Sequence, residues 1–163
     1  MRNVLIPTDF TPESLQLMEY ALLNYPGEPI HVVLVHGFRS PDSKWGLIQF
    51  STRSEVRKLR SEDFENALNR ICRTHGKSIG SVQTLLFTGR NTHAFKNAIE
   101  PLEITDAVVP ENGTLNCRNR RSFDPTRYIR KCVDRVAEVP YETDQKEASK
   151  QQFSLQNLLN LRT

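Results

Sequence analysis

The feature that most restricts the fold of this chain is an almost wholly aliphatic run at Ile30–Val35. A strand with one face in water alternates apolar and polar residues, whereas a strand that is covered on both faces is apolar throughout. Strands of the second kind occur mainly in parallel sheets, because the helices that connect parallel strands cover both faces of the sheet. The run therefore predicts a parallel sheet within an α/β fold.

Segments of strand and helix character alternate along the chain. Strands are expected at Asn3–Pro7, Ile30–Val35, Val82–Phe87, Ala107–Val109 and Val136–Tyr141. Helices are expected after the cap candidate Thr11, over residues 54–75, from Asn91 or Thr92 to Ile99, and from Asp124 to Val133. Residues 39–53 have the composition of a loop, but the apolar residues Trp45, Leu47, Ile48 and Phe50 predict that this loop packs against another surface. This alternation predicts a three-layer α/β/α sandwich with a mainly parallel five-stranded sheet, which is a Rossmann-like arrangement.

The chain has 163 residues, which suits one domain of ordinary size. We expect that domain at residues 1–141, followed at 142–163 by a polar linker and an amphipathic helix that carries Phe153, Leu155, Leu158 and Leu159. No apolar run approaches the roughly 20 residues that span a bilayer, so no membrane association is expected. The three cysteines cannot form a closed set of disulfides, and the N-terminus has no signal-peptide core, so a cytoplasmic protein is expected.

In an open parallel sheet, ligands bind beyond the carboxyl ends of the strands. The residues at those ends are Pro7, Thr8, Asp9, His36, Gly37, Gly89, Arg90 and Val109–Gly113. The stretch from Asn3 to Ser14 resembles the first strand and turn of the universal stress protein family, and the order of elements over roughly residues 2–140 is similar. This resemblance implies an adenine-nucleotide site in which Asp9 lies near adenine and ribose. From its residues alone, Asp9 has a second interpretation, in which it caps its own turn.

The phosphate-binding half of the family pattern is altered. The pattern reads Gly, two residues, Gly, nine residues, then Gly-Ser or Gly-Thr, and here these positions hold Pro110, Gly113 and Phe123-Asp124. Pro110 has no N–H to donate, Phe123 is bulky where the backbone should approach phosphate, and Asp124 repels phosphate. The resemblance together with these changes predicts that MgATP is not bound in the family's usual manner, and bound ATP or AMP is disfavoured.

Basic residues gather late in the chain, although the net charge is only +3. Residues 118–135 hold seven basic and two acidic side chains, an excess of +5. Arg118, Arg120 and Arg121 lie in the loop that should hold phosphate, where they are either solvated or contact phosphate through their side chains. No histidine or cysteine has metal-ligand spacing, and no nucleophile has a base nearby in sequence, so neither a metal site nor an enzyme is expected.

The leading hypothesis is a non-catalytic stress-response or regulatory protein that has lost ordinary MgATP binding. A first alternative is an adenine-nucleotide sensor that uses Asp9 and the Arg118–Arg121 loop. A second alternative is a protein that binds an anionic partner or nucleic acid through residues 118–135, although nucleic acid is not the expected partner because few aromatic residues are interleaved there. We also expect a homodimer, because the family commonly pairs through its last strand and the apolar C-terminal segment needs a partner surface.

Overall fold

The computed structural model describes residues 1–111 and 115–140. Its strands are β1 (Arg2–Pro7), β2 (Ile30–Phe38), β3 (Ile79–Phe87), β4 (Asp106–Pro110), β5 (Ser122–Phe123) and β6 (Val136–Val139). Its α-helices are α1 (Gln16–Asn24), α2 (Lys44–Gln49), α3 (Thr52–Leu59), α4 (Glu62–Thr74), α5 (Thr92–Ile99) and α6 (Thr126–Cys132). Short 3-10 helices lie at η1 (Pro12–Leu15), η2 (Gly76–Ser78) and η3 (Glu100–Leu102). None of the helices in this part of the chain is long and apolar enough to cross a membrane.

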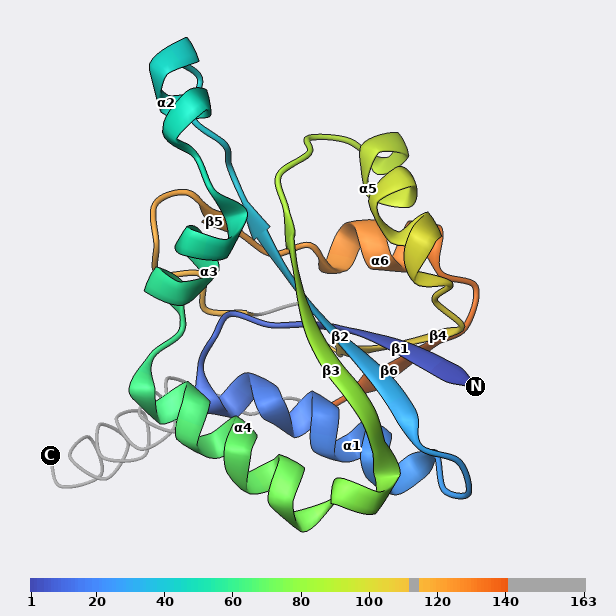
Figure 1. Ribbon diagram of the computed structural model, residues 1–163. Helices are drawn as coiled ribbons and strands as arrows, with labels where there is room; N and C mark the ends of the chain where they lie inside the picture. Colours follow the sequence, from blue (N-terminus) through green and yellow to red (C-terminus); the bar gives the residue numbers. More distant parts are fainter. Residues whose placement is uncertain (112–114, 141–163) are drawn as a thin grey trace, which may run out of the picture.

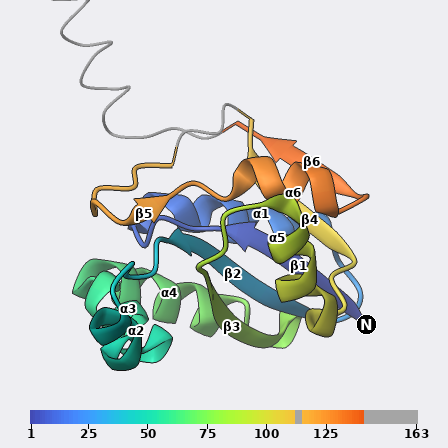
Figure 2. The ribbon, with the colours of Figure 1, turned by 90° about the horizontal axis from the view of Figure 1, so that it is seen from above.

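The sheet runs in the order β3-β2-β1-β4-β6, and neighbouring strands in this order are parallel. The two-residue strand β5 adds an antiparallel pairing at the end of β2. Strands β3 and β6 lie at opposite edges of the sheet (Figure 2). The predicted three-layer α/β/α sandwich with a mainly parallel sheet is confirmed. The winding reverses between β1 and β4, which is the place where folds of this kind usually bind ligands.

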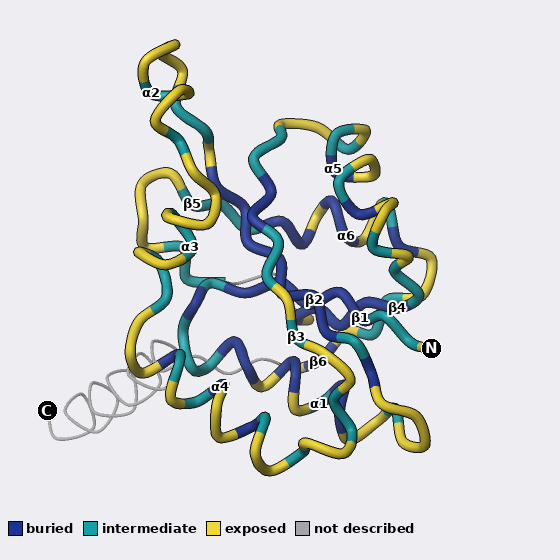
Figure 3. Tube along the Cα trace, in the orientation of Figure 1, coloured by how far each residue is buried: buried dark blue, intermediate teal, exposed yellow. Residues whose placement is uncertain are grey.

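Two apolar clusters, one on each face of the sheet, hold the helices in place (Figures 1 and 3). Successive residues of a strand point to opposite faces, so a strand that is apolar throughout can feed both clusters. Val32 and Leu34 of β2 join the cluster with Leu17 of α1, while Val33 and Val35 join the one with Ile129 of α6. Each such aliphatic side chain contributes about 1.5–3 kcal/mol when fully buried, which explains why Ile30–Val35 dominates the sequence pattern.

Two predictions for the region between β2 and β3 are wrong. Residues 39–53 contain helix α2 rather than only a loop. Trp45 and Ile48 on that helix are each 76% exposed, and of the apolar residues expected to pack, Phe50 does so by stacking on Phe38. The single helix expected over residues 54–75 is two helices, α3 and α4, which are separated at Arg60 and Ser61. The Ser61 hydroxyl accepts a hydrogen bond from the backbone N–H of Phe64 and so begins a new helix.

Both predicted helix caps are confirmed, whereas β2 continues to Phe38 and β3 begins at Ile79, each three residues beyond its predicted bound. Thr11 caps η1, and the Asn91 side chain caps α5 by accepting from the backbone N–H of Ala94. The last strand, expected to end at Tyr141, ends at Val139 within the described residues, and it lies at the edge of the sheet that Pro140 permits. The C-terminal helix expected after residue 142 lies outside the described residues.

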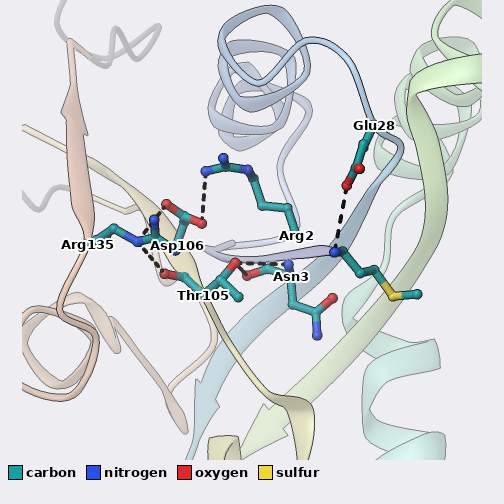
Figure 4. Close-up of polar contacts among 7 residues, drawn as sticks. Arg2, Asn3, Glu28, Thr105, Asp106 and Arg135 are labelled. Carbon is teal, nitrogen blue, oxygen red and sulfur yellow. Dashed lines mark hydrogen bonds and ion pairs between the residues drawn. The ribbon is translucent and has the colours of Figure 1, made fainter.

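An ion cluster fixes the amino ends of β1 and β4 (Figure 4). Asp106, which is 3% exposed, forms ion pairs with Arg2 at 3.1 Å and with Arg135 at 3.4 Å. The guanidinium of Arg135 also donates to the Thr105 carbonyl, and Thr105 and Asn3 hydrogen-bond across the two strands. These contacts lie at the end of the sheet away from the expected ligand site, so we assign them a structural role.

Candidate functional site

The turn that follows β1 is tight and is held by several hydrogen bonds. Phe10 has a left-handed φ of 58°, which a residue with a bulky side chain rarely adopts. The Thr8 hydroxyl accepts from the Phe10 backbone N–H at 3.0 Å, and one oxygen of the Asp9 carboxylate accepts from both the N–H and the hydroxyl of Thr11. The Phe10 ring is buried against His36 at a centroid distance of 4.7 Å. The turn is therefore held by its own side chains.

The second oxygen of Asp9 is also occupied. It accepts from the backbone N–H of Asn116 at 2.7 Å, across a sequence separation of more than 100 residues. Next to Asn116, the side chain of Leu115 packs against the cluster that contains Val4 and Ile6 of β1. The segment that follows β4 thus lies against the end of β1, at the place where the winding reverses.

His36 joins the same region through both of its ring nitrogens. Its Nδ1 lies 2.8 Å from the Thr8 carbonyl oxygen and its Nε2 lies 2.7 Å from the Ser122 hydroxyl. A carbonyl can only accept, so Nδ1 carries the proton, and Nε2 of the neutral ring accepts from Ser122. Burial lowers the pKa of His36, which favours this neutral form. These two hydrogen bonds connect β1, β2 and β5 through His36, whose side chain is almost completely buried at 1% exposure.

Strand β5 continues the sheet beyond the end of β1. Ser122 and Phe123 pair with Phe38 and Gly37 of β2, and their side chains point to opposite faces as in any strand. Ser122 meets His36 on the face of α1 and α4, whereas Phe123 packs with Phe87 on the face of α5 and α6. A Cβ on Gly37 would lie 2.5 Å from the ring of Phe123, so a glycine is required beneath this ring.

Two cavities open at the carboxyl ends of the strands, one on each side of β5. The first, of about 480 Å³, has Asp9, His36, Cys117, Arg118 and Ser122 among its lining residues. The second, which we call the arginine groove, has a volume of about 850 Å³. The residues of the arginine groove are Arg39, Ser40, Asp42, Gly89, Arg90, Arg120, Arg121, Phe123, Asp124, Arg127 and Tyr128.

The arginine groove is positively charged. Five arginines and two aspartates line it, which gives a formal excess of three positive charges. Arg90 forms an ion pair with Asp42 at 2.7 Å, and both side chains are largely exposed. The second acid, Asp124, accepts hydrogen bonds from the N–H and hydroxyl of Thr126. Burial raises the pKa of Asp124, and the nearby Asp9 carboxylate adds to this effect.

Among the cysteines in the described part of the chain, Cys117 in the first cavity has the pKa that lies furthest from its usual value. Burial, and then the negative charges of Asp124 and Asp9, raise the pKa of this thiol to about 12. The thiolate is the nucleophilic form of cysteine, and it is not populated near neutral pH at such a value. Cys117 is therefore suited to packing rather than to covalent catalysis.

The residues that the sequence singled out do not converge on one ligand site. Asp9, His36 and Arg118 line the first cavity, while Gly89, Arg120 and Arg121 line the arginine groove. Thr8 and Val109 are buried, Pro7 ends β1, Gly37 lies beneath Phe123, and Gly113 lies outside the described residues. Asp9 caps its own turn, which is the second interpretation given to it, and Asp124 accepts from the N–H of Thr126 at the start of α6, where the sequence predicts a helix start.

The sequence prediction missed Arg39 and included Arg90 only as a residue at a strand end, without a ligand role, although both line the arginine groove. A signal for them existed, because each follows the carboxyl end of a strand, β2 and β3 respectively. Arg127 had been counted in the basic stretch but not assigned to a site. The three segments that carry these residues meet only when the sheet has formed.

Comparison with known proteins agrees with this architecture. No protein-family model and no curated protein matches the chain. Among solved structures, universal stress protein UspA from Lactobacillus plantarum is 14% identical with a TM-score of 0.52, and the match covers 86% of this chain and 97% of that one. A universal stress protein family protein from Arabidopsis thaliana, solved with AMP bound, is 12% identical with a TM-score of 0.50, covering 88% and 94%. The chain therefore has the fold of the universal stress proteins.

Proposed function

We propose that this protein is a non-catalytic regulatory protein with the universal stress protein fold that does not bind MgATP in the family's usual manner. The observation that carries the proposal is the state of Asp9. Both of its carboxylate oxygens accept hydrogen bonds from the protein itself, one from Thr11 and the other from Asn116. A nucleoside that used Asp9 would have to break these contacts, and each hydrogen bond to a charged group is typically worth about 1.5–3 kcal/mol.

The phosphate side supports the same proposal. Pro110 ends β4 without an N–H, Phe123 lies over Gly37, and Asp124 adds a carboxylate to the groove wall. The alternative of a nucleotide sensor needs Asp9 and the arginines of the 118–121 loop to reach one ligand. Instead, Arg118 lines the cavity of Asp9 while Arg120 and Arg121 line the arginine groove, so this alternative receives less support.

The non-catalytic part of the proposal rests on the polar groups of the first cavity. His36 uses both ring nitrogens for structural hydrogen bonds, and the thiol of Cys117 is protonated at neutral pH. Neither group is free to act as a base or a nucleophile as it stands. A regulatory protein needs neither.

Calorimetric titration with MgATP, AMP and adenosine tests the proposal. We expect no micromolar binding of AMP or adenosine, because these ligands depend on the site at Asp9. The Asp124→Ser variant removes the carboxylate that repels phosphate. We expect its affinity for MgATP to remain weak, because Pro110 still has no N–H to donate to a phosphate. Micromolar binding of AMP that adenosine displaces would contradict the proposal. Adenosine carries no phosphate, so this outcome is distinct from any binding at the arginine groove.

A further inference from the structure

We propose that the arginine groove binds a compact polyanion, a small ligand with two or more phosphate groups, through guanidinium side chains. Its five arginines come from four separate parts of the chain, namely the ends of β2 and β3, the loop before β5, and α6. This site goes beyond the proposed function, which concerns a nucleotide bound at Asp9 and a backbone phosphate loop rather than an anion held by arginine side chains.

The charges of the groove are incompletely compensated by the protein. Within the described residues, Asp42 pairs with Arg90, and no ion pair reaches Arg39, Arg120, Arg121 or Arg127. Like charges that face one cavity repel each other, and an anion between them removes that repulsion. Guanidinium groups also match phosphate oxygens with two parallel hydrogen bonds, which makes phosphate the favoured anion.

Several of the arginines are already held in position. Tyr128, 4% exposed, donates its hydroxyl to the Arg90 carbonyl at 3.1 Å. The guanidinium of Arg127 donates to the same hydroxyl at 2.7 Å and lies 4.6 Å from the centre of the Tyr128 ring. The backbone N–H of Arg39 donates to the carbonyl of Arg121 at 2.8 Å, so these two residues are adjacent. A ligand therefore meets a groove whose backbone positions are fixed before it binds.

The size and the aromatic residues of the groove favour a compact ligand. Its volume of about 850 Å³ lies within the range of small-molecule sites. Tyr128 is 4% exposed, and the Arg127 guanidinium lies 4.6 Å from the centre of its ring, so this ring offers no free face for a base to stack on. Recognition then rests on the charge of the phosphates rather than on a base, which disfavours a single-stranded nucleic acid.

Titration of the full chain with tripolyphosphate at low ionic strength, without divalent metal, tests this proposal. We expect binding that strengthens from phosphate to pyrophosphate to tripolyphosphate and weakens as salt is added. The Arg120→Gln/Arg121→Gln double variant is expected to lose at least tenfold in affinity, and Arg39→Gln several-fold. The matched control is Arg118→Gln, an exposed arginine of the same loop that lines the other cavity; its affinity should stay within twofold of the unmodified protein.

Three results would overturn the proposal. The first is no binding of tripolyphosphate at low ionic strength. The second is an equal loss of affinity in Arg118→Gln, which would indicate attraction by the loop's charge rather than a site. The third is an oligonucleotide that binds more than tenfold tighter than tripolyphosphate. All of the substituted arginines are exposed, so thermal melting should show that the variants fold like the unmodified protein. The Asp124→Asn variant removes a negative charge from the groove and should therefore bind tripolyphosphate more tightly than the unmodified protein does.

Discussion

A single buried imidazole connects the two loops that meet at the candidate site. His36 bonds to the turn after β1 through the Thr8 carbonyl and to β5 through Ser122, and burial lowers its pKa. The unfolded chain takes up a proton on this side chain near pH 6.5, and the folded protein does so only at lower pH. Between these two pKa values the unfolded state binds more protons, so stability rises with pH through this window.

We therefore expect the free energy of unfolding to fall as the pH drops below about 6.5, by at most about 1.4 kcal/mol per pH unit from this one group. Urea unfolding at several pH values between 5 and 7 measures the slope. The His36→Gln variant should show a smaller slope over the same range. Asp124 acts in the opposite sense, because its pKa is raised by burial and its stabilising effect is lost as pH rises above 3.8. Equal slopes in both proteins would refute the assignment to His36.

A second prediction at this scale concerns Asp106, whose carboxylate faces Arg2 and Arg135 (Figure 4). The Asp106→Asn substitution removes a buried negative charge and leaves both guanidiniums unpaired there. We expect it to lower the free energy of unfolding by about 1–2 kcal/mol, because the arginines remain partly solvated. Arg135→Gln, at a side chain 64% exposed, should cost less than about 1 kcal/mol. Chemical denaturation that finds Asp106→Asn within error of the unmodified protein would contradict this role.

At the scale of elements, serines explain why a loop was predicted over residues 39–53, where the structure has helices. Residues 39–53 contain Pro41, Gly46 and several serines, a composition typical of loops. In the structure, Ser43 and Ser51 each cap the start of a helix by accepting a backbone N–H bond, and Ser61 does the same for α4. The same residue type favours turns and helix starts, so composition alone could not separate a loop from two short capped helices.

Helix α2 makes the next prediction testable with the protein's own fluorescence. Trp45, the single tryptophan of the chain, is 76% exposed on a helix that projects from the domain (Figures 1 and 3). We expect its emission to resemble that of indole in water and to be quenched freely by iodide. Trp45→Ala should change the free energy of unfolding by no more than about 0.5 kcal/mol. A blue-shifted emission that resists iodide would show that another surface covers α2.

Across the whole molecule, the fold was predictable and the site was not. The aliphatic run of β2 and the alternation of elements suffice for the layers and the parallel sheet, because both depend on local pattern. The division of the candidate site depends on β5, a two-residue strand that pairs with β2 across more than 80 residues. No local pattern encodes that pairing, and for this reason the sequence placed Asp9 and Arg120 near one ligand.

Assembly belongs to the same scale. We propose a homodimer, supported by the position of β6 at the edge of the sheet, where its outer side pairs with no described strand. The apolar residues Phe153, Leu155 and Leu158 lie outside the described part of the chain. Sedimentation of the full chain and of a version that ends at Glu142 should give a dimer for the first and weaker association for the second. A monomer in both cases would reject the proposal.

The central claim is that β5 separates a cavity whose Asp9 carboxylate is already hydrogen-bonded by the protein from an arginine groove that binds anions. Its most direct test is amide chemical-shift mapping by NMR. AMP and tripolyphosphate are titrated separately into the labelled full chain. The account predicts that tripolyphosphate shifts the amides of Arg90 and Arg127 and leaves those of Asp9, Thr11 and Asn116 in place, while AMP shifts none of these five to saturation at micromolar concentration. Saturable shifts at Asp9, Thr11 and Asn116 with micromolar AMP would contradict it.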